Sequence, residues 1–206
     1  MIQALNLSCS RDDRTLFSEL SFSVNAGQVL LLEGKNGSGK TTLLRILCGF
    51  READSGQILW HNEPIETTDY HADMAYIGHL DGIKKELTVL ENLKMSLALA
   101  TAGNYTITQA LEKVHLAGYD DALVQTLSAG QKRRLSLARL LITKKPLWLL
   151  DEPFTSLDKS GIALISELMV EHCQLGGLII LTSHHDLDLK AIEVQRINLS
   201  QRKTLK

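Results

Sequence analysis

The chain has 206 residues and a mass of 22.8 kDa, and 44% of its residues are hydrophobic, so it can bury a core without disulfides or metals. Its 3 prolines and a charged fraction of 22% exclude disordered, collagen-like and linker-dominated chains. The formal net charge of -2 gives no overall attraction to nucleic acid, and no apolar run reaches the roughly 20 residues of a membrane-spanning helix.

The first part of the chain carries strand signals on both sides of one helix. Residues 20–24 alternate between apolar and polar side chains, which predicts a strand of an antiparallel sheet with one face in water. Residues 29–32 are all apolar, as in a strand that is covered on both faces. A helix is expected over 41–48, and a short strand over 57–60.

The middle of the chain, residues 80–127, has a helical pattern and is interpreted as an inserted helical subdomain. Thr88 and Glu91 have the spacing of a capping box ahead of an apolar helix, and we expect Gly103 to end that helix. The chain is nevertheless short enough to form a single domain over 1–206.

The last third returns to alternating helices and strands. A helix is expected over 128–143 and a buried strand over 147–150, followed by a helix with one apolar face that the glycines at 176–177 stop. Another apolar strand is expected over 178–181. Strands that alternate with helices predict an α/β fold with a mostly parallel sheet, here joined to an N-terminal antiparallel β subdomain.

A glycine-rich loop between the first buried strand and the first helix fits the Walker A pattern G-x-x-x-x-G-K-[ST]. Such a loop lets several backbone N–H groups converge on phosphate oxygens, and the following helix adds its positive end. Lys40 is expected to reach the β- and γ-phosphates, and the Thr41 hydroxyl to ligate Mg²⁺. The candidate nucleotide-binding residues here are Gly34, Asn36, Gly37, Ser38, Gly39, Lys40, Thr41 and Thr42. The loop therefore predicts a P-loop NTPase.

Two adjacent acids, Asp151 and Glu152, end the apolar strand at 147–150. Acids at a strand end are usually solvated, but a Walker A loop in the same chain gives them a second interpretation. Asp151 is then placed to hold the Mg²⁺ shell, and Glu152 to polarise the water that attacks the γ-phosphate. Lys40 and Glu152 are therefore candidate catalytic residues.

The segment Leu-Ser-Ala-Gly-Gln at 127–131 distinguishes between classes of P-loop NTPase. By itself it is equally typical of any helix that begins at a serine cap. Together with the two Walker elements, it resembles the signature helix of ABC-type ATPases. The resemblance implies that Ser128, Gly130 and Gln131 bind the phosphate of an ATP held by a second subunit, so that ATP closes a homodimer with two composite sites.

The resemblance to ABC-type ATPases implies two further site residues. Asp158, in the Ser-Leu-Asp run at 156–158, occupies the D-loop position and is expected near the dimer seam. The switch histidine falls on His184, just after the strand at 178–181, with His185 as the alternative. An imidazole there can form a hydrogen bond to the γ-phosphate and sense its loss, which makes His184 a third candidate catalytic residue.

Two positions depart from the ABC pattern. His79 stands where a Q-loop glutamine is usual, and a neutral imidazole can also bind a Mg²⁺-bound water, so His79 is a candidate metal-site residue. The segment that usually supplies an aromatic ring under the adenine contains none, and the guanidinium of Arg11 is expected to stack there instead.

Across its whole length the chain resembles the ATP-binding subunits of the haem exporter used in cytochrome c maturation. The stretches that carry this resemblance are 14–22, 33–34, 76–79, 82–84, 127–131 and 151–155. The resemblance implies an ATPase, with ATP and Mg²⁺, that binds integral membrane subunits on the cytoplasmic face of the inner membrane. It also implies that hydrolysis drives the release of a haem-loaded chaperone. No direct contact with haem is expected, because the other histidines show no ligand spacing.

The sequence bears on several other functions as well. A soluble ABC ATPase without a membrane subunit, of the iron–sulfur assembly type, and the ATP-binding subunit of a different ABC transporter remain alternatives. A DNA-repair ABC protein needs a longer heptad insertion than 80–127 offers. A GTPase is disfavoured because no Asn-Lys-x-Asp motif is present, and a module without hydrolysis is disfavoured by Glu152 and His184. A small-molecule kinase has no use for the helix that begins at Ser128.

Overall fold

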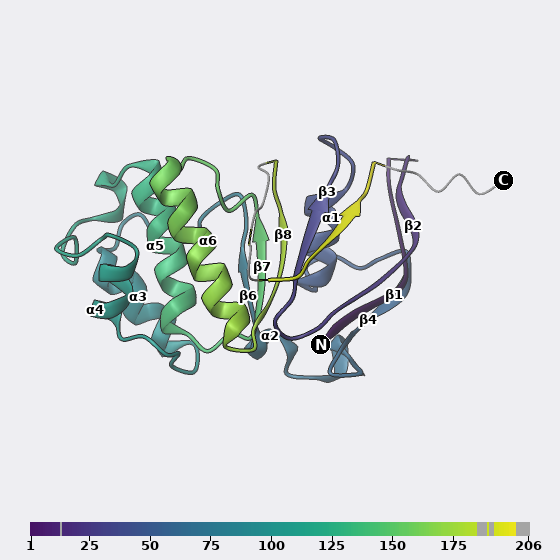
Figure 1. Cartoon of the computed structure of the whole chain (residues 1–206), viewed down its shortest axis with the longest axis horizontal. Coiled ribbons are helices and arrows are strands. Elements are labelled where there is room, and N and C mark those ends of the chain that lie inside the picture. Colours follow the sequence, from purple (N-terminus) through teal and green to yellow (C-terminus); the bar gives the residue numbers. More distant parts are fainter. Residues whose placement is uncertain (13, 185–188, 190–191, 201–206) are drawn as a thin grey trace.

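The computed structural model describes residues 1–12, 14–184, 189 and 192–200. In this part of the chain, a four-stranded antiparallel sheet has the order β2-β1-β4-β5, and a five-stranded parallel sheet has the order β6-β7-β8-β3-β9. Figure 1 shows the antiparallel sheet at one end of the molecule, the parallel sheet in the middle and most of the helices at the other end. The predicted α/β fold class, with a parallel core and an N-terminal antiparallel sheet, is confirmed.

The antiparallel sheet contains the N-terminus of the chain. Its strands are β1 (Ile2–Arg11), β2 (Arg14–Val24), β4 (Ser55–Trp60) and β5 (Glu63–Pro64). Ile2 pairs with Val24 on one side and with Trp60 on the other, so all three apolar side chains come together. This sheet packs against α1 (Lys40–Leu47), which lies between the two sheets (Figure 1).

The parallel sheet separates two hydrophobic cores. Its strands are β3 (Val29–Glu33), β6 (Met74–Ile77), β7 (Leu147–Asp151), β8 (Leu178–Thr182) and β9 (Val194–Asn198). Successive side chains of a strand point to opposite faces, so Leu30 and Leu32 join the core with α1, whereas Val29 and Leu31 join the core with the remaining long helices. Burial on both faces explains why β3, β7 and β8 are almost continuously apolar, whereas β9, at the edge of the sheet, contains polar residues.

The helices on the second face of the parallel sheet belong to the last two thirds of the chain. They are α3 (Val89–Ala98), α4 (Ile107–Lys113), α5 (Ala129–Ile142) and α6 (Lys159–Gln174), with a shorter helical turn at Val124–Thr126. The short helical segments Ile65–Thr67 and α2 (Tyr70–Asp73) pack instead in the core with α1. The capping box predicted at Thr88 and Glu91 is present.

The expectation that Gly103 ends the helix after Thr88 is wrong, because α3 ends at Ala98 with Leu99 as its C-cap. Gly103 instead lies against the end of α5, where its N–H donates to Ile142 O at 2.8 Å. A Cβ there would lie 2.7 Å from Leu141 O, so this position needs glycine for the close approach of two chain segments.

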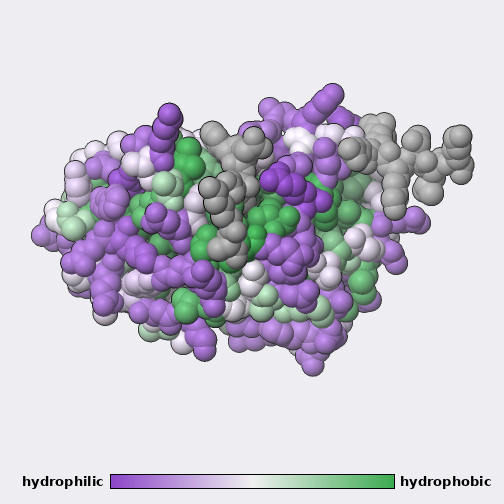
Figure 2. Space-filling view, viewed as in Figure 1, coloured by the Kyte–Doolittle hydropathy of each residue, from purple (hydrophilic) through white to green (hydrophobic). Residues whose placement is uncertain are grey.

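The face of the molecule drawn in Figure 2 is largely hydrophilic. In the view of Figure 2 the polar residues cover the helical end and most of the periphery, and apolar residues show mainly in the middle, over the parallel sheet. No helix of the described residues has both the length and the apolar character needed to span a membrane.

Candidate nucleotide-binding site

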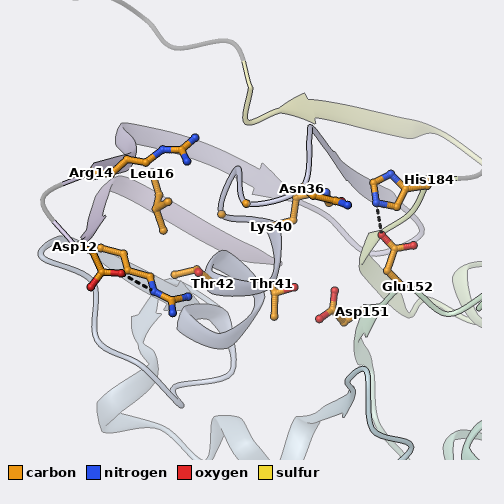
Figure 3. A pocket seen from close by; sticks show the side chains of 13 residues that line it. Asp12, Arg14, Leu16, Asn36, Lys40, Thr41, Thr42, Asp151, Glu152 and His184 are labelled. Atoms are coloured by element: carbon orange, nitrogen blue, oxygen red, sulfur yellow. Dashed lines mark ion pairs between the residues drawn. The ribbon is translucent and has the colours of Figure 1, made fainter.

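The carboxyl ends of β3, β7 and β8 meet at one edge of the parallel sheet, because the three strands are parallel neighbours. The glycine-rich loop follows β3, the two acids follow β7, and His184 follows β8. Together they surround a cavity of about 510 Å³ (Figure 3). The predicted site residues that line it are Arg11, Asn36, Gly37, Gly39, Lys40, Thr41, Thr42, Asp151, Glu152 and His184.

The backbone of the loop at 34–39 needs its glycines. Gly34 has φ +140° and Gly39 has φ +104°, which are values that favour glycine. A Cβ at Gly34 would lie 2.6 Å from Ser38 Oγ, and a Cβ at Gly39 would lie 3.1 Å from Leu16 Cβ. Gly34 and Ser38 therefore shape the loop, although neither lines the cavity.

The first turn of α1 is open to an anion. Its N-cap is Gly39, which has no side chain, so no side-chain hydrogen bond caps the helix. The N–H groups of a first turn have no helical partner, and the helix dipole makes this end positive. Lys40 is buried, and its Nζ donates to Gly34 O at 2.7 Å and lies 3.4 Å from Lys35 O. The loop thus holds a cation and free donors together, which suits phosphate groups.

Asp151 is held by a residue from the neighbouring strand. The hydroxyl of Thr182 donates to Asp151 Oδ1 at 2.7 Å and accepts from the Glu152 N–H at 2.9 Å. Thr182 was missed at the sequence level, although its place at the end of a buried strand, in register with Asp151, was a usable signal. Asp151 and Thr41 both present oxygen atoms to the cavity (Figure 3), and such hard donors fit Mg²⁺.

Glu152 and His184 lie side by side on the wall of the cavity. Glu152 Oε1 is 3.4 Å from His184 Nε2, and among the described residues Oε1 has no hydrogen-bond partner (Figure 3). The backbone of Glu152 has φ +50°, a value that residues other than glycine rarely adopt. A carboxylate that lacks a hydrogen bond can accept a proton from water. The alternative switch residue, His185, lies outside the described residues.

The residues of the predicted signature motif lie away from this cavity. Ser128 is the N-cap of α5; its Oγ accepts from the Gln131 N–H at 3.2 Å, and Gln131 Oε1 accepts from the Ser128 N–H at 2.8 Å. Neither these residues nor Gly130 line the cavity of their own chain. They are therefore free to face another molecule.

Asp158 is the N-cap of α6 and is also not among the residues that line the cavity. It accepts from the Gly161 N–H at 2.8 Å, and this bond, with the Ser160 hydroxyl, lowers the pKa of the Asp158 carboxyl. Arg134 from α5 forms an ion pair with it at 3.6 Å. The start of α6 is thereby linked to the signature helix.

His79 and Arg11, the two departures from the ABC pattern, lie in different places. His79 is exposed on a separate cavity of about 60 Å³, which shares only Glu152 with the large one. Arg11 lines the large cavity and forms an ion pair with Asp12 at 3.4 Å. Arg14 and Leu16 also line this end of the cavity, and sequence reasoning missed them.

Two titratable groups close to Asp151 stay protonated near neutral pH. Burial, and then the negative charge of Asp151, raises the pKa of the Cys48 thiol to about 12. Burial raises the pKa of Tyr76 as well, with Asp151 adding to the effect. Neither group competes with Glu152 as an acceptor of protons.

Comparisons with known proteins agree with this geometry. The ABC transporter family model matches residues 17–155. The cytochrome c biogenesis ATP-binding export protein CcmA of Vibrio cholerae is 47% identical and covers 98% of this chain and 100% of its own length. CcmA of Escherichia coli K12 is 44% identical and covers 98% of this chain and 97% of its own length.

Solved structures show the same fold. A putative ABC transporter ATP-binding protein from Pyrococcus furiosus has a TM-score of 0.82 at 24% identity, over 96% of each chain. The dimeric structure of a bacterial ABC transporter cassette has a TM-score of 0.82 at 20% identity, over 98% of this chain and 97% of that one. The chain is an ABC-type ATPase and belongs to the CcmA family of cytochrome c biogenesis ATP-binding export proteins.

Proposed function

We propose that two copies of this ATPase hydrolyse Mg-ATP at composite sites and thereby power the haem exporter of cytochrome c maturation. The proposed ATPase activity rests on one observation. A single cavity brings together the uncapped N-terminus of α1, the Lys40 ammonium, and the side chains of Asp151, Glu152 and His184. Family membership supports the transport part, because the relatives are named as ATP-binding export proteins of cytochrome c biogenesis.

The loop and α1 bind the phosphates. The N–H groups of the loop and first turn donate to phosphate oxygens, and Lys40 exchanges its bonds to Gly34 O and Lys35 O for the β- and γ-phosphates. Thr41 and Asp151 would hold the Mg²⁺, which would supply positive charge beside the transferred phosphoryl group. Arg11 stacks on the base at the far end of the cavity.

Glu152 and His184 act on the attacking water. The Glu152 carboxylate accepts a proton from the water as the water oxygen bonds to the γ-phosphorus, and the bond from that phosphorus to the ADP oxygen breaks. His184, 3.4 Å from Glu152, donates a hydrogen bond to the γ-phosphate and reports its departure. The result is ADP and phosphate.

The second half of each site comes from the partner copy. Ser128, Gly130 and Gln131 lie outside the cavity of their own chain, as a surface for another subunit's ATP requires. Asp158 lies nearby, tied to the same helix by Arg134, at the seam between the two copies. ATP therefore holds the dimer together, and its hydrolysis releases it.

The ATPase couples to integral membrane subunits through the helical part of the chain. We assign residues 80–127 to an inserted helical subdomain within the single domain 1–206, and His79 to its hinge with the sheet. The His79 imidazole would bond a metal-bound water, which would link movement of the subdomain to occupancy of the site. The complex lies on the cytoplasmic face of the inner membrane, and its work is the release of a haem-loaded chaperone.

The Glu152→Gln variant tests the composite site. The amide keeps the shape of the side chain but accepts no proton, so ATP and Mg²⁺ bind without turnover and the dimer accumulates. Light scattering with Mg-ATP is expected to give twice the monomer mass for the variant and the monomer mass without nucleotide. A variant that binds ATP and stays monomeric at all concentrations contradicts the proposal.

A further inference from the structure

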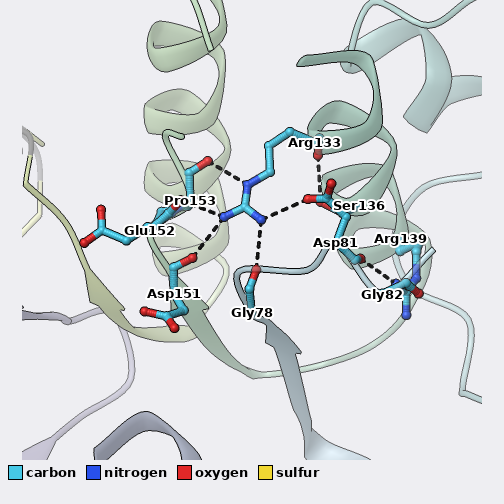
Figure 4. A network of polar contacts seen from close by, with 9 residues as sticks. All are labelled: Gly78, Asp81, Gly82, Arg133, Ser136, Arg139, Asp151, Glu152 and Pro153. Carbon is cyan, nitrogen blue, oxygen red and sulfur yellow. Dashed lines mark hydrogen bonds and ion pairs between the residues drawn. The ribbon is translucent and has the colours of Figure 1, made fainter. Parts of the chain in front are cut away.

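Arg133 is a buried cation that the predicted motifs do not include. It lies on α5, one turn beyond the capping box of Ser128 and Gln131, and only 4% of its surface is exposed. Its guanidinium points away from solvent, toward the end of β7 and the segment that follows β6 (Figure 4). A buried charge is costly unless its donors are satisfied, so its contacts indicate its role.

Every N–H of the guanidinium has an acceptor. Nε donates to Pro153 O at 3.0 Å, and the two protons of one terminal nitrogen reach Asp151 O at 3.1 Å and Glu152 O at 2.8 Å. The other terminal nitrogen donates to Gly78 O at 3.2 Å and to Asp81 Oδ1 at 3.1 Å. An arginine has five N–H donors in a rigid fork, and all five are used here.

We propose that Arg133 is a positioning residue, which fixes the backbone that carries Glu152 and ties it to both the signature helix and the segment after β6. The proposal rests on the proposed role of Glu152 as the acceptor of the proton from water. Three consecutive carbonyls, those of Asp151, Glu152 and Pro153, converge on one guanidinium (Figure 4). With Gly78 O and Asp81 Oδ1 they make five acceptors, and only arginine offers five N–H donors in a planar fork.

The strained backbone of Glu152 explains why such a clamp is needed. Its φ of +50° is sterically unfavourable in a residue other than glycine, so surrounding contacts must hold it. Arg133 binds the carbonyl of Glu152 and not its carboxylate, which points away from the guanidinium (Figure 4). The clamp therefore orients the base without neutralising it through an ion pair.

The same guanidinium reaches the segment that contains His79. Gly78 and Asp81 flank His79, and both bond to Arg133. Arg139, two turns further along α5, bonds the same segment through Asp81 O at 3.2 Å and Gly82 O at 2.8 Å, but touches neither Glu152 nor its neighbours. Arg139 Nε also donates to Ser96 Oγ of α3 at 3.0 Å. Arg139 is thus a control that bonds the segment after β6 but donates no hydrogen bond to the backbone at 151–153 among the described residues.

The test compares Arg133→Lys, Arg133→Gln and Arg139→Gln, each in the wild-type chain and in the Glu152→Gln chain. Because lysine has at most three donors and no fork, Arg133→Lys is expected to lower kcat by about tenfold and Arg133→Gln by about 100-fold, with ATP affinity within about twofold of wild type. In the Glu152→Gln chain, neither Arg133 variant is expected to lower the residual rate further.

The outcomes separate the possible explanations. Wild-type kcat in a folded, ATP-binding Arg133→Gln protein overturns the clamp. An Arg139→Gln protein that loses as much kcat as Arg133→Gln also overturns it, because the effect then comes from the segment after β6. An equal fractional loss with and without the Glu152 carboxylate means that Arg133 acts on the fold in general and also overturns it. If Arg133→Gln does not bind ATP, Arg133→Lys decides by the same criteria. Wild-type turnover in Glu152→Gln instead contradicts the proposed function.

Discussion

The N-termini of α1 and α5 are both assigned to phosphate groups, yet they are built differently. Gly39 caps α1 without a side chain, and the end of this helix opens into a cavity with Lys40 beside it. Ser128 and Gln131 close a complete capping box on α5, which lines no part of that cavity. The first half-site is ready for its anion in the single chain.

At the second half-site, the N-terminus of α5, two backbone N–H groups already donate to the side chains of Ser128 and Gln131. A capping box occupies two of the donors that a phosphate would otherwise use. In the proposed dimer, the Gln131 N–H would therefore exchange Ser128 Oγ for a phosphate oxygen of the second subunit's ATP. In the single chain only the N-terminus of α1 has uncapped donors for a nucleotide, and the proposal therefore assigns selection of the nucleotide to α1 and a response to it to α5.

The largest effect is expected at the open half-site, which is the uncapped N-terminus of α1 with Lys40. Lys40→Ala removes a buried cation and its donors, and two lost charge-assisted hydrogen bonds of about 1.5–3 kcal/mol each predict a loss of ATPase of at least about 100-fold. ATPase rate and circular dichroism are measured together, with Lys94→Ala, an exposed lysine of α3, as the control. Near wild-type activity in folded Lys40→Ala protein contradicts the assignment.

A smaller effect is expected at the N-terminus of α5, where the capping role of Ser128 can be separated from its role in catalysis. Ser128→Ala and Thr106→Ala each remove a capping box of the same type, from α5 and α4, and each is expected to cost about 1 kcal/mol of stability. In the proposed dimer the Ser128 hydroxyl donates a charge-assisted hydrogen bond to a phosphate, and Thr106 makes no such bond. Only Ser128→Ala should therefore also lower the ATPase rate, by about tenfold. Urea unfolding and steady-state rates give both numbers. Equal rates in the two variants contradict a phosphate role for Ser128.

The smallest effect is expected at His79, which lies between the two half-sites on its own small cavity. His79→Gln should retain most of the ATPase rate, because an amide can also bond a metal-bound water. His79→Ala should lower the rate a few-fold, which corresponds to the loss of about one hydrogen bond. ATPase is measured with and without the membrane subunits, alongside the cytochrome c yield in cells. If both variants equal wild type in all three readouts, His79 has no role in coupling.

The parts of the fold and site that the sequence predicts are those encoded in contiguous residues. The Walker A loop, the capping box at Thr88 and the buried strands are each read within a few positions, and the structure has the predicted loop conformation, cap and strands. Glycine conformations, caps and apolar runs are local properties, so local patterns reveal them.

Contacts between distant segments escape such patterns. Thr182 bonds Asp151 from 31 residues away, and Arg133 bonds Gly78 from 55 residues away. Gly103 was expected to end a helix and instead allows two segments to touch. In each case the residue type is ordinary, and only the tertiary neighbour gives it a role, which no spacing along the chain can encode.

The central claim, that each catalytic site takes Lys40 from one chain and Ser128 from the other, is tested most directly by mixing two inactive variants. Lys40→Ala destroys the open half-site, and Ser128→Asp keeps α5 capped but places a negative charge where the phosphate binds.

In a heterodimer of the two variants, one site is intact and the other lacks both parts. Random pairing makes half of the dimers mixed, so the mixture is expected to recover about a quarter of wild-type ATPase while each variant alone has almost none. A mixture no more active than the mean of its two components contradicts the composite site.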